Sequence, residues 1–286
     1  MRYTATPRSF TKLELLIILT IITVLLAIII VGVDRTLANA RSQVDARQIN
    51  TVHKGWLIAA TEIDAVAPLP SLAVQHDSSS HEDFSLNHSA NIYSLIIAWE
   101  LFPPGNFISP HEVSDHVTEA DYNYDAYDPT NDVYWAPAFV MHIEDPAIGA
   151  NSSYAHIAAV GDRRDALRMA KSSSDVPILG TRGPDVTNLD PAEYHRSPTY
   201  RFSKPYDRWT GNIVFADNHG ETLQTFYPQL TAYQSSGHDR AIKDNIFSAD
   251  FDHPHGPQAA ADAFLCICTA ATQFTVDDVY DPLLDD

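Results

Sequence analysis

Charged residues are absent from one long stretch near the start of the chain. Residues 15–33 are nineteen uncharged and mostly apolar residues, with Glu14 at the edge of the run. At about 1.5 Å of rise per residue in a helix, they span the roughly 30 Å hydrocarbon core of a lipid bilayer. This pattern predicts a membrane-spanning helix. A carboxylate at its edge is costly to leave unpaired there, so we expect Glu14 to meet a cation.

Apolar residues at helical spacing continue beyond this run, now mixed with charges. One stripe holds Leu37, Val44, Val52, Trp56, Ala59 and Ile63, while other positions hold Arg35, Arg41, Asp45 and Lys54. This spacing is typical of a helix that packs one side on a protein body. We therefore expect one helix from Phe10 to about Ile63, ended by Pro68 and Pro70.

The remainder of the chain predicts a mixed α and β body. Residues 71–90 are polar and predict a loop, and residues 92–99 predict a short helix with Ser89 as its candidate cap. Residues 211–221 predict a β-hairpin, and residues 263–276 predict a buried strand pair. The expected fold class is α+β, with the long N-terminal helix packed on an antiparallel β-sheet.

Charge separates the N-terminal flank from the body. Arg2, Arg8, Lys12 and Glu14 precede residue 34, so residues 34–286 hold 15 of the 18 basic and 36 of the 37 acidic residues, a net charge of −21. A basic flank stays on the cytoplasmic side of a membrane, so we expect the body outside the cytoplasm. A body this acidic repels phosphates, which argues against nucleic acid as a partner.

The chain has two cysteines, Cys266 and Cys268. In an extended segment, the Cα atoms of a Cys-x-Cys pair lie near the upper limit for a disulfide. Two small core residues are therefore favoured over a metal or redox pair, because no other cysteine completes a site.

Residues 9–14 read Ser-Phe-Thr-Lys-Leu-Glu, directly before the apolar run. This start resembles that of type IV pilins and of type II secretion pseudopilins, with Ser9 at the place of the usual glycine. The resemblance implies that a prepilin peptidase cuts between Ser9 and Phe10 and methylates the new amine of Phe10. Glu14, fifth from Phe10, would then pair with an N-terminal amine during assembly. The alternative is an uncleaved signal anchor.

Short motifs in the body resemble those of large bacterial pilin-like proteins. Residues 106–112 read Asn-Phe-Ile-Ser-Pro-His-Glu, with Ser109 where many of those proteins have cysteine. Residues 152–155 and 176–184 read as strands and follow in the same order as in those proteins. Residues 212–219 carry the more specific pattern Asn-x-x-Phe-Ala-Asp-x-His. The resemblance implies a pilin-like α+β fold.

Residues 121–132 contain a candidate calcium loop. Asp121, Asn123 and Asp125 have the alternate spacing with which a tightly curved segment offers oxygens to Ca²⁺, and Asp132 is the candidate ligand at its end. Ala126 stands where an EF-hand needs glycine, so a standard EF-hand is excluded. A looser calcium site and a solvated tyrosine-rich loop remain as alternatives, and no other cofactor is expected.

Together these features predict a structural subunit, not an enzyme. The expected parts are a leader (1–9), a transmembrane or filament-core helix (10–33), its amphipathic continuation (34–64) and a globular ectodomain with an acidic tail (65–286). By the resemblance, the subunit crosses the inner membrane once and joins an extracellular type IV filament or a periplasmic secretion pseudopilus. Its partners would be prepilin peptidase, other pilin-like subunits, an inner-membrane assembly platform and membrane lipid. The alternatives are an adhesive tip protein and a membrane-anchored surface hydrolase, although the Gly-x-Ser-x-Gly and His-Glu-x-x-His motifs are absent from the sequence.

Overall fold

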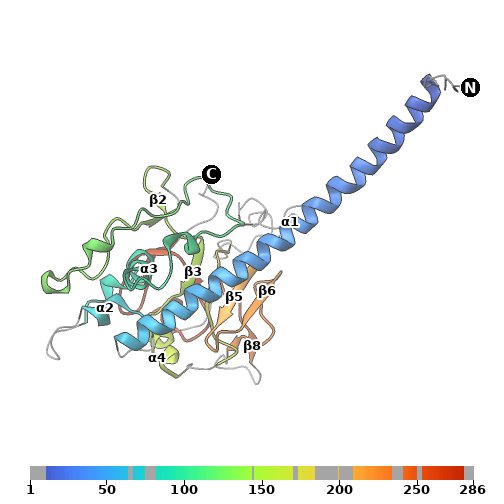
Figure 1. Ribbon diagram of the computed structural model, residues 1–286. Helices are drawn as coiled ribbons and strands as arrows, with labels where there is room; N and C mark the ends of the chain where they lie inside the picture. The colour runs from blue at the N-terminus through green and yellow to red at the C-terminus, as the bar shows by residue number, and fades with distance from the viewer. Residues whose placement is uncertain are drawn as a thin grey trace, which may run out of the picture. The chain divides into compact units, whose positions relative to one another are not determined.

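The computed structural model of the protein is α+β, with a long N-terminal helix and an antiparallel sheet, which confirms the expected fold class at this level (Figure 1). The structure describes residues 11–63, 67–74, 82–143, 145–169, 173–183, 199, 209–233, 241–249 and 253–279. Contacts divide the chain into two units, Met1–Ala40 and Arg41–Asp286.

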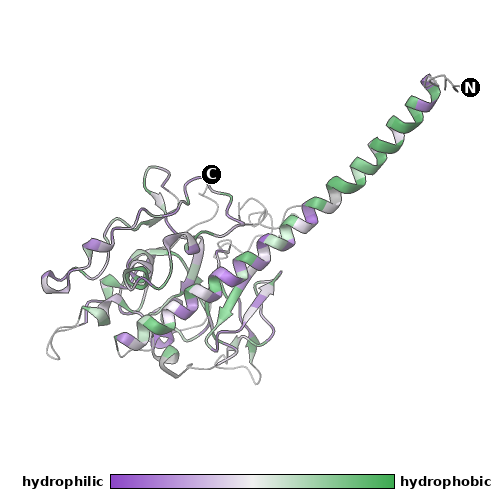
Figure 2. Cartoon of the chain, in the orientation of Figure 1, coloured by the Kyte–Doolittle hydropathy of each residue, from purple (hydrophilic) through white to green (hydrophobic). Residues whose placement is uncertain are grey.

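Helix α1 (Lys12–Glu62) is 51 residues long and ends one residue before the predicted position. Up to Leu37, its described side chains are exposed, and Figure 2 shows that this part is predominantly hydrophobic. Within the described residues, α1 is the one helix long and apolar enough to cross a membrane.

The main sheet has five strands, and every neighbouring pair in it is antiparallel. In spatial order they are β6 (Gly220–Leu223), β5 (Gly211–Phe215), β4 (Pro177–Thr181), β3 (Tyr154–Ile157) and β9 (Leu265–Cys266). Strands β5 and β6 form the predicted hairpin. Within the described ranges, three two-stranded sheets pair β1 (Met141–His142) with β2 (Gly149–Ala150), β7 (Ala232–Tyr233) with β8 (Ile242–Lys243), and β10 (Cys268–Ala271) with β11 (Val276–Val279).

The described part of the second unit also contains shorter helices. They are α2 (Pro70–Ala73), α3 (Ser89–Ala98), α4 (Gly161–Met169) and the 3-10 turns η1 (Phe84–Leu86), η2 (Pro104–Phe107), η3 (Tyr124–Ala126), η4 (Pro129–Asn131) and η6 (Pro257–Ala259). The predicted helix near residues 92–99 exists as α3, but Ser89 is not its cap. His88 occupies the cap position, and the Ser89 hydroxyl bonds to residues outside the helix.

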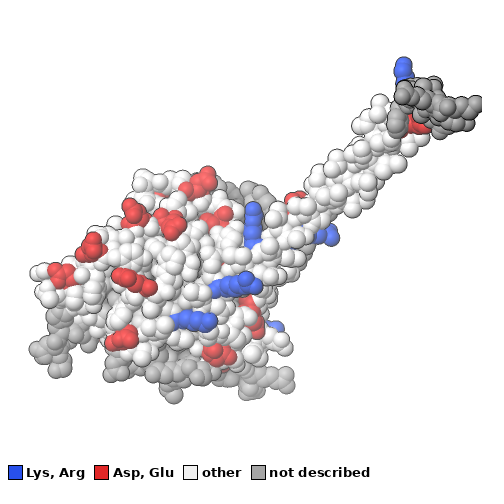
Figure 3. All heavy atoms as spheres, viewed as in Figure 1, with Lys and Arg blue, Asp and Glu red and all other residues white. Residues whose placement is uncertain are grey.

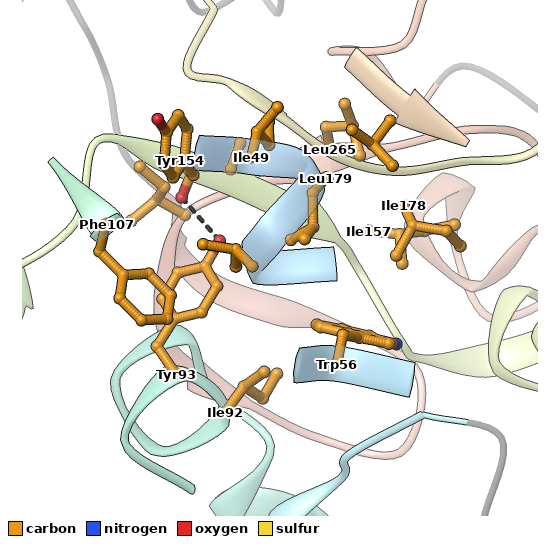
Figure 4. Close-up of a cluster of buried hydrophobic side chains, with 14 of the residues drawn as sticks. Ile49, Trp56, Ile92, Tyr93, Phe107, Tyr154, Ile157, Ile178, Leu179 and Leu265 are labelled. Atoms are coloured by element: carbon orange, nitrogen blue, oxygen red, sulfur yellow. Dashed lines mark hydrogen bonds between the residues drawn. The ribbon is translucent and has the colours of Figure 1, made fainter. Parts of the chain in front are cut away.

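The hydrophobic core lies between the second half of α1, α3 and the main sheet. Ile49, Val52, Trp56 and Ala59 are buried at alternating steps of three and four residues, as one face of a helix requires. Figure 4 shows Ile49 and Trp56 together with side chains from α3 and from strands β3, β4 and β9. The prediction was therefore right for Val52, Trp56 and Ala59.

Three members of the predicted apolar stripe are not buried, and one of them, Ile63, is half-buried. Leu37 is 50% exposed and Val44 is 47% exposed, whereas Asp45, which was predicted to lie off the stripe, is completely buried. The reason is positional: residues 45, 49, 52, 56 and 59 share one side of the helix, and position 44 lies beside it.

The two cysteines are free and buried, as the sequence predicts. They do not lie in one strand, because Cys266 ends β9 in the main sheet and Cys268 begins β10 in a smaller one. The predicted strand pair at residues 263–276 is thus divided between two sheets.

Candidate functional site

A buried carboxylate joins the long helix to the sheet. Four neutral donors point at Asp45: Ser109 Oγ at 2.5 Å and Tyr154 OH at 2.9 Å bond to Oδ1, while Asn212 Nδ2 at 2.6 Å and Thr181 Oγ1 at 3.0 Å bond to Oδ2. Among the described residues, no cation forms an ion pair with Asp45. Hydrogen bonds alone therefore compensate the loss of water around this carboxylate.

The four donors come from separate places in the sequence. Ser109 follows η2, and Tyr154, Thr181 and Asn212 belong to β3, β4 and β5, three adjacent strands of the main sheet. Each of the four lies within a motif on which the resemblance to pilin-like proteins rests. These motifs thus meet at one point beneath α1, which we call the Asp45 junction.

Further hydrogen bonds hold Asn212 in place at the Asp45 junction. The Asn212 amide also donates to the Ser42 carbonyl at 3.1 Å, and its Oδ1 accepts from Thr222 at 2.6 Å, so both ends of the amide are used.

Burial, together with the adjacent Asp45, raises the pKa of Tyr154 well above its ordinary value. The phenol therefore keeps its proton and remains a donor at neutral pH.

A buried ion pair lies close to the Asp45 junction. Arg182 bonds to both carboxylate oxygens of Glu112, with Nη2 2.5 Å from Oε1 and Nε 3.1 Å from Oε2. Burial opposes the charged form of Glu112, but the charge and hydrogen bonds of Arg182, with further bonds from Ser114 and Ser153, outweigh it and lower the pKa of Glu112. The loop after η2 is thereby tied to the end of β4.

The β5–β6 turn also contacts α1. Asn218 has a left-handed backbone with φ of 67°, and its Oδ1 lies 2.9 Å from Nδ1 of the buried His53. His53 Nε2 has no hydrogen-bond partner among the described residues. Burial lowers the pKa of His53, although the Asn218 bond and the charge of Asp217 act in the opposite direction. The imidazole is therefore neutral at neutral pH.

The helix start contains a capping box that the sequence analysis did not identify. Thr11 N and Thr11 Oγ1 each lie 2.9 Å from Glu14 Oε2, and Glu14 N donates to Thr11 Oγ1 at 3.2 Å. The pattern Thr-x-x-Glu before an apolar run is the sequence signal for this arrangement. Glu14 thus has a local partner at the first turn, and its expected pairing with an amine remains a prediction.

The expected cleavage site, Ser9 and Phe10, lies outside the described residues.

The structure places all four candidate calcium ligands in local turns or on the surface, and Asp125 is exposed within η3. Asn123 Oδ1 accepts from the backbone N of Asp125 at 3.1 Å and caps η3. Asp132 has a left-handed backbone at the end of η4, and Asp121 is exposed. In the described part of the chain, no group of three or more His, Cys, Asp or Glu side chains is arranged to hold a metal ion. Calcium binding stays a prediction.

One serine and histidine pair has the contact distance of a nucleophile and its base. Ser89 Oγ lies 2.8 Å from His156 Nε2, and Ser89 Oγ also accepts from the backbone N of Cys268 at 2.8 Å. Both side chains are buried, at 0% and 1% exposure. This pair connects α3 to β3 and β10 inside the core. Because a substrate cannot reach so buried a hydroxyl, the pair does not favour the hydrolase alternative.

No protein-family model matches the chain, and comparisons with curated proteins and with solved structures also find no match.

Proposed function

We propose that this chain is a membrane-anchored structural subunit of a type IV filament or secretion pseudopilus, assembled through its N-terminal helix. The observation that carries the proposal is the contrast along α1. Its first part is apolar and exposed up to Leu37, whereas from Asp45 onward one side of the helix is buried in a folded body. An apolar helix that is continuous with a protein-packed helix suits a subunit whose anchor becomes part of an assembly.

The anchor would hold the subunit in the inner membrane as a single span, with the acidic body outside the cytoplasm. The basic residues Arg2, Arg8 and Lys12 on the N-terminal flank support this orientation. Prepilin peptidase would release the amine of Phe10, and the assembly platform would then move the subunit from lipid into the filament.

Glu14 would select the position of each incoming subunit. In a low-dielectric bundle of helices, a carboxylate and an amine offset their desolvation only where they meet. The two Thr11 contacts use Oε2, and the Glu14 carboxylate has a second oxygen, Oε1, with which to accept from an amine. Capping and assembly are thus compatible roles for one side chain.

Maturation provides a direct test. The full chain is produced in cells with and without a prepilin peptidase, and its N-terminal peptide is identified by mass spectrometry. We expect a peptide that begins at Phe10, N-methylated, only where the peptidase is present. Ser9→Gly, which restores the usual cleavage residue, should raise the processed fraction. Recovery of the Met1 form from both kinds of cell, for both variants, would instead identify the span as a signal anchor.

A further inference from the structure

Basic residues are segregated along the chain. No lysine or arginine occurs between Lys54 and Arg163, and residues 55–162 contain 16 acidic residues. The second half of α1 therefore contains basic residues, whereas all Asp, Glu, Lys and Arg residues in positions 55–162 are acidic. Figure 3 shows basic side chains along this part of α1 and several acidic side chains elsewhere on the same face.

The outer side of α1 offers both charge and apolar surface. Arg47 and Lys54 are exposed and seven residues apart, so they lie on one side of the helix. Val44, Leu57 and Ile58 surround them with exposures of 47%, 39% and 46%. We call these five residues the basic outer face.

Its cations lack partners within the described structure. Arg163, Arg164 and Arg182 are paired with Asp262, Glu82 and Glu112, respectively. By contrast, no described carboxylate forms an ion pair with Arg47 or Lys54. The basic outer face thus presents two unpaired charges beside apolar side chains.

A surface with the opposite properties lies around η3. Glu119, Asp121 and Asp125 are exposed, and no described cation pairs with them. The same segment contains Tyr124 and Tyr127, which are 38% and 45% exposed. These five residues form what we call the acidic loop. Its aromatic rings can cover apolar side chains and also lie over cations.

We propose that the basic outer face of one copy docks on the acidic loop of a second copy. The two surfaces match in both charge and apolar content, and each is on the unit Arg41–Asp286. Because the contact joins different surfaces, each copy keeps one of them free for the next copy, so the contact can repeat. This inference rests on the proposed function, since it names the partner of the ectodomain in the assembly.

Charge determines the choice of partner. Residues 34–286 carry a net charge of −21, so two whole molecules repel each other unless their opposite charges are brought together locally. A contact of this kind is specific, and salt should weaken it. Two other partners would use only one of the surfaces: an anionic lipid surface would bind the basic outer face, and a calcium-mediated contact would use the acidic loop. Exchanging the charges between the two surfaces therefore distinguishes docking of a second copy from both alternatives.

Charge reversal on the full chain in detergent micelles tests the contact. Self-association is measured by sedimentation at low and high salt, with a chelator present to remove calcium. We expect Arg47→Glu/Lys54→Glu to weaken association about tenfold, and Asp121→Lys/Asp125→Lys to do the same. Combining all four substitutions in one chain should restore most of the association, because the two surfaces again carry opposite charges. Lys243→Glu and Asp277→Lys, at exposed positions on β8 and β11, serve as controls and should change little.

Three outcomes would overturn the inference: wild-type chains that do not associate, a combined variant no better than the two double variants, or an effect of only one double variant. Maturation at Phe10 and the ability to form filaments can be measured in the wild-type chain, so the test of the proposed function does not require the four substitutions. Normal processing together with an unchanged association constant would therefore reject the docking contact and leave the proposed function in place.

Discussion

The hydroxyl of Tyr154 lies 2.9 Å from Oδ1 of Asp45 and connects the central part of the sheet directly to α1. The backbone carbonyl of Tyr154 in turn accepts from the hydroxyl of Tyr93 on α3 at 2.8 Å, the bond drawn in Figure 4. One strand residue therefore ties two helices to the sheet, and its contact with Asp45 is suited to a quantitative test.

Removing the Asp45 carboxylate should destabilise the body strongly. Asp45→Ala leaves four buried donors without their acceptor, and we expect a loss of about 3 kcal/mol in the free energy of unfolding. Asp45→Asn should lose less stability than Asp45→Ala but more than none. Its side chain keeps one oxygen acceptor, but its NH2 group would face one of the donors, such as the Asn212 amide. Urea unfolding of the full chain in detergent gives both values.

Two further variants make the Asp45 test specific. Gln43→Ala changes an exposed neighbour on the same helix and should alter stability by less than about 0.5 kcal/mol. Tyr154→Phe should cost about 1 kcal/mol in the wild-type chain and much less in the Asp45→Ala chain. Equal costs in both backgrounds would show that the Tyr154 hydroxyl does not act through Asp45.

The capping box separates two roles of Glu14. Glu14→Gln keeps a side-chain oxygen that can accept from Thr11, whereas Glu14→Ala removes both the cap and the charge. We expect both variants to remain in the membrane. If charge drives assembly, both should lose filaments or secretion about equally, and if hydrogen bonding contributes, Glu14→Gln should be intermediate. Electron microscopy and a secretion assay at matched protein level give the result.

Thr11→Val is the matched control for Glu14, because it removes the capping hydroxyl and leaves the carboxylate. Assembly close to the wild-type level is expected from this variant. Should Thr11→Val lose filaments as fully as Glu14→Ala does, the capping role would be the important one and the proposed registering role of Glu14 would be wrong.

Mild acid should weaken the body through His53. Its pKa is lowered in the folded state, primarily by burial, so below about pH 6.5 the unfolded chain binds the proton more readily. The contribution is fully present above the unfolded pKa and is lost as pH falls toward the folded value. The half-buried His88 acts in the same direction, since its partial burial lowers its pKa as well. Thermal unfolding at pH 7.5 and 5.5 should show this loss.

Substitution isolates the contribution of His53 from that of His88. His53→Gln removes the titrating ring and can still donate to Asn218, so the difference in melting temperature between pH 7.5 and 5.5 should shrink. His255→Gln, at an exposed position, should leave the difference unchanged. A pH dependence identical in all three proteins would exclude His53 as its source.

Calcium at millimolar concentration is predicted to raise the melting temperature of the ectodomain. Binding to the folded state alone adds about 1.4 kcal/mol at ten times the dissociation constant. Magnesium at equal ionic strength is the control ion, and Asp121→Asn/Asp125→Asn is the control variant, which should abolish the gain. The same melting temperature with calcium, magnesium and chelator would remove the calcium site.

Local patterns predicted the long helix and the β5–β6 hairpin of this fold, but they missed α4 and the small β1–β2 and β7–β8 sheets, and the predicted loop at 71–90 contains α2 and η1. The apolar run and the stripe with Trp56 were sufficient for α1, because helical periodicity and the later prolines act over a few residues. Asn218 and Gly220 were sufficient for the hairpin, since a tight turn depends on local backbone preferences.

The Asp45 junction could not be predicted in the same way. Its donors lie 64 to 167 residues from Asp45 in sequence, and a carboxylate among polar residues is ordinarily assigned to solvent. One signal was present: the buried positions 49, 52, 56 and 59, extended backward by four residues, reach 45. Periodicity therefore indicated where Asp45 lies, but only the fold supplied the hydroxyls and the amide that make its burial tolerable.

The turn at Asn218 has a consequence for how relatives of this chain can diverge. Glycine would accept the left-handed backbone there as readily as asparagine, but it would remove the acceptor facing His53. A buried imidazole without that acceptor is costly, so a relative with glycine at this turn should have a smaller or apolar residue on the helix. Positions 53 and 218 are thus expected to change together during evolution, although 165 positions separate them in the chain.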